Sequence, residues 1–181
     1  NYAVARVKRD IGGNSYLGAM VTDVRPADGL ANTAGGLDAS FWPTSLLNVQ
    51  TFYARTATDG PGGDGSAYRL GWDYQTDGWG LTGHAVGVSP DAQADLGFIG
   101  RTDMRRYEAF TRTTQRPGVL GLRKMDFFAF GNLITRWDGA LQDRSYGPGL
   151  GFEWESGESL NAYGLRGFTR LDESFDLSDT V

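Results

Sequence analysis

The chain has no cysteine, and only two of its 181 residues are lysine, Lys8 and Lys124. Without cysteine, neither a disulfide framework nor a metal site with thiolate ligands can form. No apolar segment approaches the ~20 residues of a membrane-spanning helix, because the richest window, 127–134, is short and contains Asn132. A helical membrane protein is therefore excluded. A membrane β-barrel is not, because its strands need only ~9–11 residues each.

Basic charge is also scarce, and the formal net charge is −5. Nucleic-acid binding relies on a basic surface that neutralises phosphates, so this balance argues against nucleic acid as a partner. Nearly all the positive charge is arginine, which pairs with carboxylates through two parallel hydrogen bonds. This preference either follows from genome composition or serves a fixed internal charge lattice.

Glycine and aromatic residues are abundant. Glycine accounts for 27 of the 181 residues and aromatics for 13%, whereas the average glycine share is ~7%. The glycines show no collagen period, and the aromatic content is too high for a disordered chain. The mixture predicts an all-β protein with many turns, forming one domain or a piece of a larger one.

The clearest strand signal lies between Ser66 and Gln75. One face carries Tyr68, Leu70, Trp72 and Tyr74, and the other carries Arg69, Gly71, Asp73 and Gln75. This period of two predicts a strand with one apolar and one polar face. A tight turn at 76–78 leads into a return strand over Trp79–Val88, which places Trp79, Leu81 and Ala85 on one face and Thr82 and His84 on the other.

Other segments show the same alternation less regularly. A second hairpin is predicted from Pro148–Glu155 and Leu160–Phe168, joined by a turn at 156–158. Further strands are expected at Tyr2–Arg9, Tyr16–Thr22, Leu46–Arg55, Arg106–Thr113 and Arg123–Trp137, the last being one long strand or two. The total is roughly eight or nine strands, with longer connections at 25–40 and 56–65 and no helical segment.

Two features favour a membrane barrel over a soluble one. Charges stand in mid-strand, as in Arg69 with Asp73, and they lie opposite large aromatics; a membrane barrel has a polar lumen, whereas a small soluble barrel has an apolar interior. Aromatic residues also stand beside turns, as expected of an interfacial girdle. The expected membrane-interface aromatics are Tyr74, Trp79, Trp137 and Trp154. On pattern alone, a soluble sandwich with an aromatic core fits equally well.

The densest charge cluster is the run Arg101, Asp103, Arg105 and Arg106, with Glu108 close by. Lumen-facing charges are expected at Arg69, Asp73, Arg106, Glu108 and Arg112. In a membrane barrel such side chains should point inward, because a charge facing lipid costs ~2–4 kcal/mol at mid-depth. They form either a charged lining that selects solutes or an ion-pair network that stiffens the barrel, and the alternation of sign favours the network.

Two ordered segments carry a family resemblance. The first is Arg6-Val7-Lys8-Arg9-Asp10-Ile11-Gly12 with Gly18-Ala19-Met20, and the second is Asp95 to Asp103 with Arg105-Arg106-Tyr107. In this order they resemble the bacterial family named domain of unknown function 5916, over about Tyr2–Arg116 and more loosely beyond. The resemblance implies an outer-membrane β-barrel of a Gram-negative bacterium, without an assigned activity.

The chain departs from a whole member of that family. The carbohydrate-binding-like module that often precedes the barrel region is missing, so sugar binding is not carried over. The chain starts without Met and ends at Thr180-Val181 rather than at an aromatic residue. We therefore expect residues 1–181 to be a single β-barrel domain that is an internal fragment of a larger barrel. The alternative is a complete eight-stranded barrel.

Catalytic and metal-binding patterns are weak. His84 is the only histidine, and a triad would need Asp73 and either Ser66 or Ser89 beside it, but no nucleophile-elbow motif surrounds a serine. The loop from Asp59 to Asp64 and the acidic end, 172–179, offer oxygen ligands for Ca²⁺ without a recognised calcium-loop pattern. No catalytic residue, metal site or cofactor is expected.

The sequence therefore predicts an all-β antiparallel transmembrane β-barrel, or a segment of one, in the bacterial outer membrane. Its expected role is that of a channel, a transporter component or an assembly platform, and its expected partners are outer-membrane lipid and other envelope proteins. The alternative is a soluble or surface-attached β-domain that binds carbohydrate through exposed aromatics, namely Trp72, Trp79 and Trp154. An enzyme ranks third.

Overall fold

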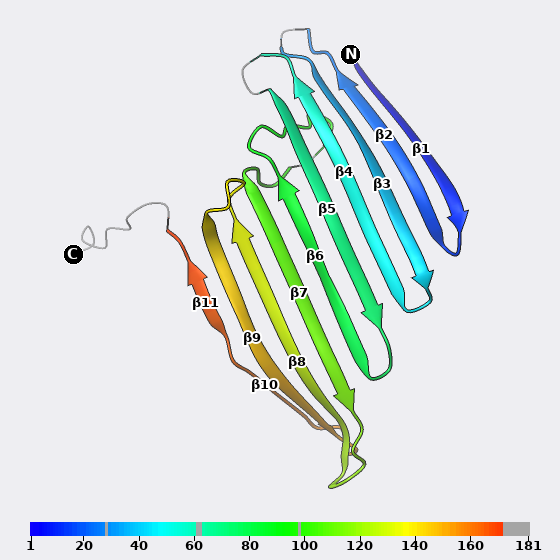
Figure 1. The fold of residues 1–181 in the computed structure, drawn as a ribbon, viewed down its shortest axis with the longest axis vertical. Helices are drawn as coiled ribbons and strands as arrows, with labels where there is room; N and C mark the ends of the chain where they lie inside the picture. The colour runs from blue at the N-terminus through cyan, green and yellow to red at the C-terminus, as the bar shows by residue number, and fades with distance from the viewer. Residues whose placement is uncertain (28, 61–62, 98, 172–181) are drawn as a thin grey trace, which may run out of the picture.

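The computed structural model describes residues 1–27, 29–60, 63–97 and 99–171, and within them the chain forms one antiparallel sheet without a helix. The strands follow one another in space in chain order, and β10 and β11 both pair with β9 (Figure 1). Their bounds are β1 (Tyr2–Gly12), β2 (Ser15–Val24), β3 (Asn32–Thr44), β4 (Leu47–Thr58), β5 (Asp64–Gln75), β6 (Trp79–Val88), β7 (Met104–Gln115), β8 (Leu122–Thr135), β9 (Leu141–Trp154), β10 (Ser159–Tyr163) and β11 (Arg166–Thr169).

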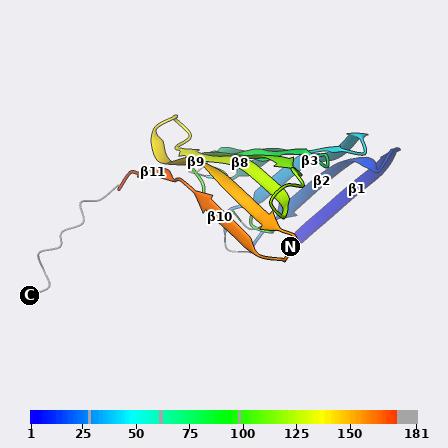
Figure 2. The ribbon, with the colours of Figure 1, turned by 90° about the horizontal axis from the view of Figure 1, so that it is seen from below.

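The sheet is curved into an open arch (Figure 2). It does not close: among the described strands, β1 pairs only with β2, and β10 and β11 pair only with β9. The all-β antiparallel prediction is confirmed, whereas closure into a barrel is not seen in this sheet. β1, β10 and β11 are exposed along their whole length, because each lies at an edge of the sheet.

Several predicted strands are confirmed, and the hairpin of β5 and β6 lies where the alternation placed it. The range Arg123–Trp137 corresponds to the single strand β8. The expected connection over 25–40 was wrong in its second half, because β3 occupies Asn32–Thr44. The expected strand Leu160–Phe168 is divided between β10 and β11, and with β3 this raises the number of strands to eleven.

The connections differ in length between the two ends of the sheet. At the lower end of Figure 1 they are short, and the described chain there turns at 13–14, 45–46, 76–78, 116–121 and 155–158. At the upper end the connections span 25–31, 59–63, 89–103 and 136–140. The connection 89–103 is the longest, at fifteen residues.

An ion pair joins two of the lower connections. Arg116 donates two hydrogen bonds to Asp77, at 2.6 and 2.8 Å. These hydrogen bonds and the arginine charge lower the pKa of the Asp77 carboxyl, so the pair is fully charged at neutral pH. Because both side chains are exposed, the pair aligns the two turns and adds little to the stability of the sheet.

The sheet has almost no apolar core. Among the described residues only Ala39, Val88 and Ala92 are buried and hydrophobic, whereas large apolar side chains are exposed on nearly every strand. The accessible surface is 12158 Å², compared with about 8,600 Å² for a compact monomer of 19.7 kDa. One layer of sheet therefore leaves much of its apolar surface exposed.

Candidate functional site

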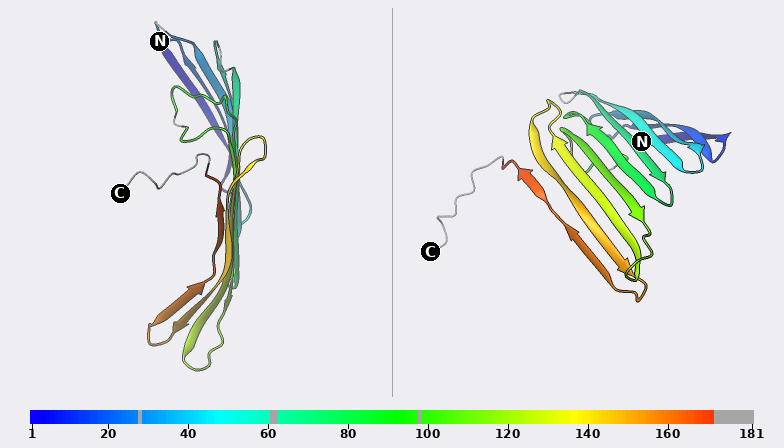
Figure 3. Two further views of the ribbon diagram at one scale, coloured as in Figure 1. Left: turned by 90° about the vertical axis from the view of Figure 1, so that its left-hand side faces the viewer. Right: turned by 60° about the horizontal axis from the view of Figure 1, so that its bottom comes forward.

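The two faces of the sheet differ in where they carry charge. Cross-strand partners point to the same side, so the register places Thr51, Leu70, Ala85, Tyr107 and Leu133 in one row across β4–β8. The adjacent row on the other face holds Gly71, His84, Glu108, Asn132 and Ser145. The second row lies on the same side of the sheet as Thr56 and Asn32, whose side chains bond to Gln93 in the connection 89–103. That connection lies on the concave side of the arch (Figure 3), so the second row belongs to the concave face and the first to the convex face.

The apolar face is convex. Its large side chains that remain exposed are Val7, Leu17, Val21, Leu37, Tyr53, Leu70, Trp79, Tyr107, Phe127, Tyr146, Leu150, Leu160 and Phe168. On β1–β9 the charged side chains that the register places on this face lie within four positions of a strand end, at Arg9, Asp23, Arg55, Asp64, Arg105 and Arg144. On β11, Arg166 lies opposite Tyr146, in the interior of β9. An uncharged band therefore crosses the middle of the convex face on β1–β9.

The predicted charge cluster lies on the concave face. Arg69 and Asp73 project from β5, and Arg106, Glu108 and Arg112 project from β7 to the same side. The alternation along each strand predicted that these side chains share a face. In the sheet, β5 and β7 lie on either side of β6.

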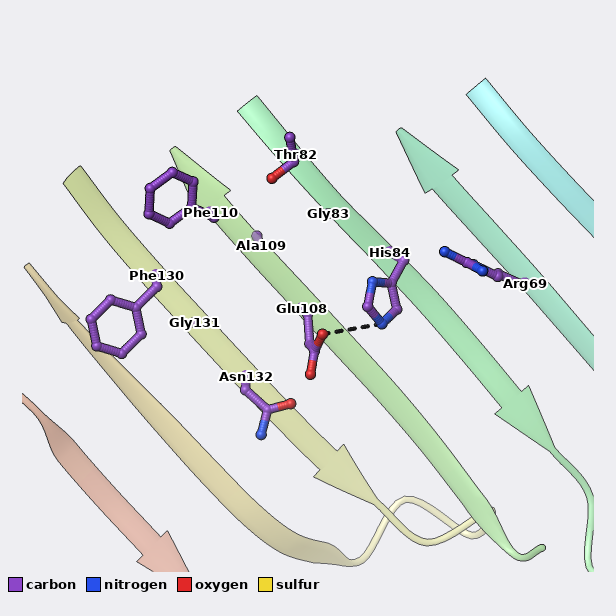
Figure 4. Close-up of a pocket in the computed structure, with 10 residues that line it drawn as sticks. All are labelled: Arg69, Thr82, Gly83, His84, Glu108, Ala109, Phe110, Phe130, Gly131 and Asn132. Atoms are coloured by element: carbon purple, nitrogen blue, oxygen red, sulfur yellow. Dashed lines mark ion pairs between the residues drawn. The ribbon is translucent and has the colours of Figure 1, made fainter. Parts of the chain in front are cut away.

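Polar groups converge on a hollow in the middle of this face, with a volume of about 450 Å³ (Figure 4). His84 Nε2 lies 3.2 Å from Glu108 Oε2, and the other carboxylate oxygen of Glu108 accepts a hydrogen bond from Arg106. Arg69 also lines the hollow and forms no ion pair with any described residue. The Glu108 carboxylate thus contacts both His84 and Arg106. The guanidinium of Arg69 remains available to bind a solute in the hollow.

Asn132 completes the hollow from β8, opposite Glu108 in the register. Its Oδ1 is buried and has no hydrogen-bond partner within the described chain. Because a buried acceptor without a donor is costly, this atom is a natural acceptor for water or for a passing solute. Phe110 and Phe130 border the hollow beside these polar groups.

A second set of ion pairs lies nearer the lower end of the concave face. Asp126 accepts a hydrogen bond from Thr114 at 2.6 Å, and it lies 2.8 Å from Lys124 and 4.0 Å from Arg112. Arg6 and Asp38 pair at 2.9 Å across β1–β3. The expected ion-pair network therefore exists for part of the cluster, but Arg69 and Asp73 do not pair with each other in the described structure.

The dense charge run at 101–106 does not stay together. Arg105 points to the convex face and Arg106 to the concave face, because they are neighbours in one strand. Asp103 lies before β7, where its carboxylate accepts hydrogen bonds from Arg136 Nε at 3.0 Å and from the Trp137 backbone at 3.1 Å. Asp103 therefore ties two upper connections together rather than lining the concave face.

The four predicted interface aromatics lie on the convex side near the two ends of the sheet. At the lower end, Tyr74 and Trp79 have ring centroids 5.1 Å apart, and Trp154 lies 6.2 Å from Phe152. At the upper end, Trp137 lies 6.2 Å from Tyr68, with the Arg105 guanidinium 4.7 Å from its ring. Aromatic rings thus border the uncharged band above and below.

Among the described residues, no catalytic triad is assembled around His84. Ser66 points to the convex face, opposite to His84, and Ser89 Oγ accepts the Ser66 backbone N–H at 2.8 Å. His84 is paired with Glu108 instead of Asp73. Within the described residues no group of three or more His, Asp or Glu side chains is placed to hold a metal ion. Asp64 lies 3.6 Å from Arg55, and the acidic end, 172–179, lies outside the described residues.

Sequence reasoning missed two parts of this face. Asn32 begins a strand that was not predicted, and the connection 89–103 lies against the concave face beside it. The only signal in the sequence was the length of that connection, because loops of this length are uncommon in compact domains.

Comparison with known proteins identifies no relative: no protein-family model, curated protein or solved structure matches this chain. In the part of the chain that the structure describes, no helix is long and apolar enough to span a membrane.

Proposed function

We propose that this chain forms the wall of an outer-membrane β-barrel, with its convex face in contact with lipid acyl chains and its concave face lining an aqueous passage. One observation carries the proposal: mid-strand charges lie on the concave face, and the convex face of β1–β9 has none. Membrane barrels have this inverted arrangement, whereas soluble barrels carry their charges outside.

The outward face of β8, the longest uncharged one among β1–β9, is long enough to span a membrane. In β8 the outward positions run from Met125 to Thr135 without a charge, which is about 34 Å along a strand. At the strand tilt of about 40° usual in barrels, this length spans about 26 Å. The apolar band of outer-membrane barrels is ~25 Å tall and is bordered by aromatic girdles at both interfaces.

The two free edges of the sheet support the proposal that their backbone groups pair with other strands in a closed barrel. β1 presents eleven residues at a free edge, and β10 and β11 form the opposite edge. In a membrane such backbone groups need partners, because lipid offers no hydrogen bonds. β1 runs downward in Figure 1 and β11 runs upward, so antiparallel closure is possible either directly or through additional strands.

The connections suggest an orientation. Outer-membrane barrels have short periplasmic turns and longer extracellular loops. The end of the sheet that carries 89–103 would therefore face the outside of the cell, and the turns at 13–14 and 45–46 would face the periplasm.

The polar hollow at Arg69, His84 and Glu108 favours passage of small hydrophilic solutes, as in a channel or transporter component. Membership of the domain of unknown function 5916 family is part of the same proposal, and its support is the ordered pair of segments in the sequence. The carbohydrate-binding alternative would use the convex face, where Trp72, Trp79 and Trp154 lie. The observation that favours it is a hollow of about 330 Å³ on that face, which is lined by Trp72, Tyr107 and Tyr146.

The proposal is tested by refolding the urea-denatured chain with and without lipid. We expect β-structure and resistance to denaturation in detergent micelles or phospholipid vesicles, and aggregation in plain buffer. A folded, monodisperse monomer recovered from buffer without amphiphile would overturn the proposal.

The ion selectivity of the passage is expected to depend on Glu108. Glu108→Gln removes the negative charge that faces Arg106 and His84 and leaves Arg69 and Arg106 unopposed. A unit charge about 5 Å from an ion in water changes its energy by about 0.8 kcal/mol, or about fourfold in relative concentration. In a salt gradient, the reversal potential should therefore shift in the direction of anion preference. The shift should correspond to about a fourfold change in the permeability ratio of cations and anions.

The matched control is Asp23→Asn, which removes the same charge from the convex face at the upper end of β2. It should leave the reversal potential unchanged. Equal shifts in the two variants would show that Glu108 does not face the ion path.

A further inference from the structure

The connection 89–103 folds back over the concave face. In Figure 3 this segment, between β6 and β7, lies on the hollow side of the arch, whereas the connection between β8 and β9 projects to the other side. Unlike a loop that extends into solvent, it occupies space in front of the inner surface of β3–β5.

Asn32 fastens this loop. Its side chain is 1% exposed, and it is the only side chain of the described residues below 2%. Its Nδ2 donates to the backbone oxygen of Gln93 at 3.0 Å, and its Oδ1 accepts the backbone N–H of Asp95 at 3.3 Å. Buried amides satisfied in this way define one position for the chain that they contact.

Two further contacts hold the same segment. The Thr56 hydroxyl accepts the backbone N–H of Gln93 at 3.2 Å. Ala92, one of the three buried apolar residues, rests directly on Gly65, where an added Cβ would overlap the backbone of Ala92. Glycine at position 65 is thus required for the loop to approach the wall.

Beyond these anchors the loop stands away from the wall. A cavity of about 450 Å³ separates it from a floor of small residues, which includes Gly36, Ala54 and Ala67. The loop therefore projects into the space in front of the sheet instead of filling a packed core. The polar hollow at Arg69 and Glu108 lies beside it and is not covered by the described loop residues.

We propose that the loop 89–103 is a constriction that limits the size of the solutes that pass along the concave face, and that Asn32 is the residue that positions it. This inference rests on the proposed function, because a constriction needs an aqueous passage. The solutes that it admits are small hydrophilic molecules that pass between the loop and the polar hollow.

The test is the single-channel conductance of the refolded protein in planar bilayers, with polyethylene glycols of graded size as blockers. Asn32→Ala removes both side-chain bonds to the loop, and Gly65→Leu displaces Ala92 while it leaves Asn32 intact. We expect each variant to raise the conductance about twofold or more and to admit larger polyethylene glycols. Replacing 91–100 with two glycines should have the largest effect.

Asn48→Ala is the matched control. Asn48 is also a buried asparagine of the concave face, but its amide donates to Ser40 Oγ and to the backbone oxygen of Phe41, within the sheet. The conductance of the Asn48→Ala variant should equal that of the unmodified protein. Resistance of each variant to denaturation verifies folding before the recordings.

The outcomes separate the two proposals. Unchanged conductance and size limit in the folded Asn32→Ala, Gly65→Leu and loop-replacement variants would overturn the constriction while the channel stands. Folding without amphiphile, or absence of conductance in the unmodified protein as well, would overturn the proposed function.

Discussion

Leu70→Arg is expected to lower the stability of the membrane-inserted protein by about 2–4 kcal/mol, the cost of an arginine at the midplane of the lipid-facing side. Leu70 lies in the middle of the uncharged outward positions of β5 and is 45% exposed. In a soluble protein a half-exposed site accepts such a change at a cost of about 0.5 kcal/mol or less. Urea titration of the protein in phospholipid vesicles measures the difference.

Thr82→Arg is the control for this substitution. Thr82 lies on the neighbouring strand and on the concave face, opposite Asp73 in the register. The new arginine would face water and a carboxylate, so we expect no loss of stability. Equal losses in the two variants would show that both faces meet the same environment.

Gly83→Ala is expected to destabilise the sheet by about 1–3 kcal/mol, the usual cost of overpacking. A Cβ at position 83 would lie 2.5 Å from the backbone oxygen of Glu108 and 2.6 Å from the Trp72 ring. The ring lies across the glycine on the convex face, so β6 and β7 would have to separate or the indole would have to move. The free energy of unfolding in detergent micelles measures the effect.

Gly71→Ala serves as the comparison because it makes the same change on the adjacent strand. The nearest atoms to a Cβ at Gly71 lie at 3.8 Å, an ordinary van der Waals distance. Its unfolding free energy should stay within about 0.5 kcal/mol of the unmodified protein. A cost at Gly71 as large as that at Gly83 would indicate that the effect is a general property of strand glycines.

The strands that the sequence predicted best are those with the strongest alternation. β5 and β6 place large aromatic or aliphatic side chains opposite charges and small polar groups, so the period of two is visible locally. β3 contains Asn32-Thr33-Ala34-Gly35-Gly36, which has the composition of a loop. It is a strand because β2 and β4 supply hydrogen bonds on both sides, and those partners lie outside the segment whose composition is read.

The sequence could predict which residues of the candidate site share a face of the sheet, but not which of them contact one another. Alternation alone puts Arg106, Glu108 and Arg112 on one side of a strand. The pairing of His84 with Glu108 depends on the register between β6 and β7 across a fifteen-residue connection, which no local pattern sets. The fold-back of that connection depends on Asn32, which lies 61 residues from its partner Gln93.

The most direct test of the central claim is labelling of single cysteines in vesicles by a charged, membrane-impermeant thiol reagent with access to the lumen. Because the chain has no cysteine, each introduced thiol reports alone. We expect Asn132→Cys and Glu108→Cys to react and their neighbours Leu133→Cys and Ala109→Cys to be protected, since the neighbours point to the convex face. Rapid reaction at all four positions, or protection at 108 and 132 with reaction at 109 and 133, would contradict a lipid-facing convex surface.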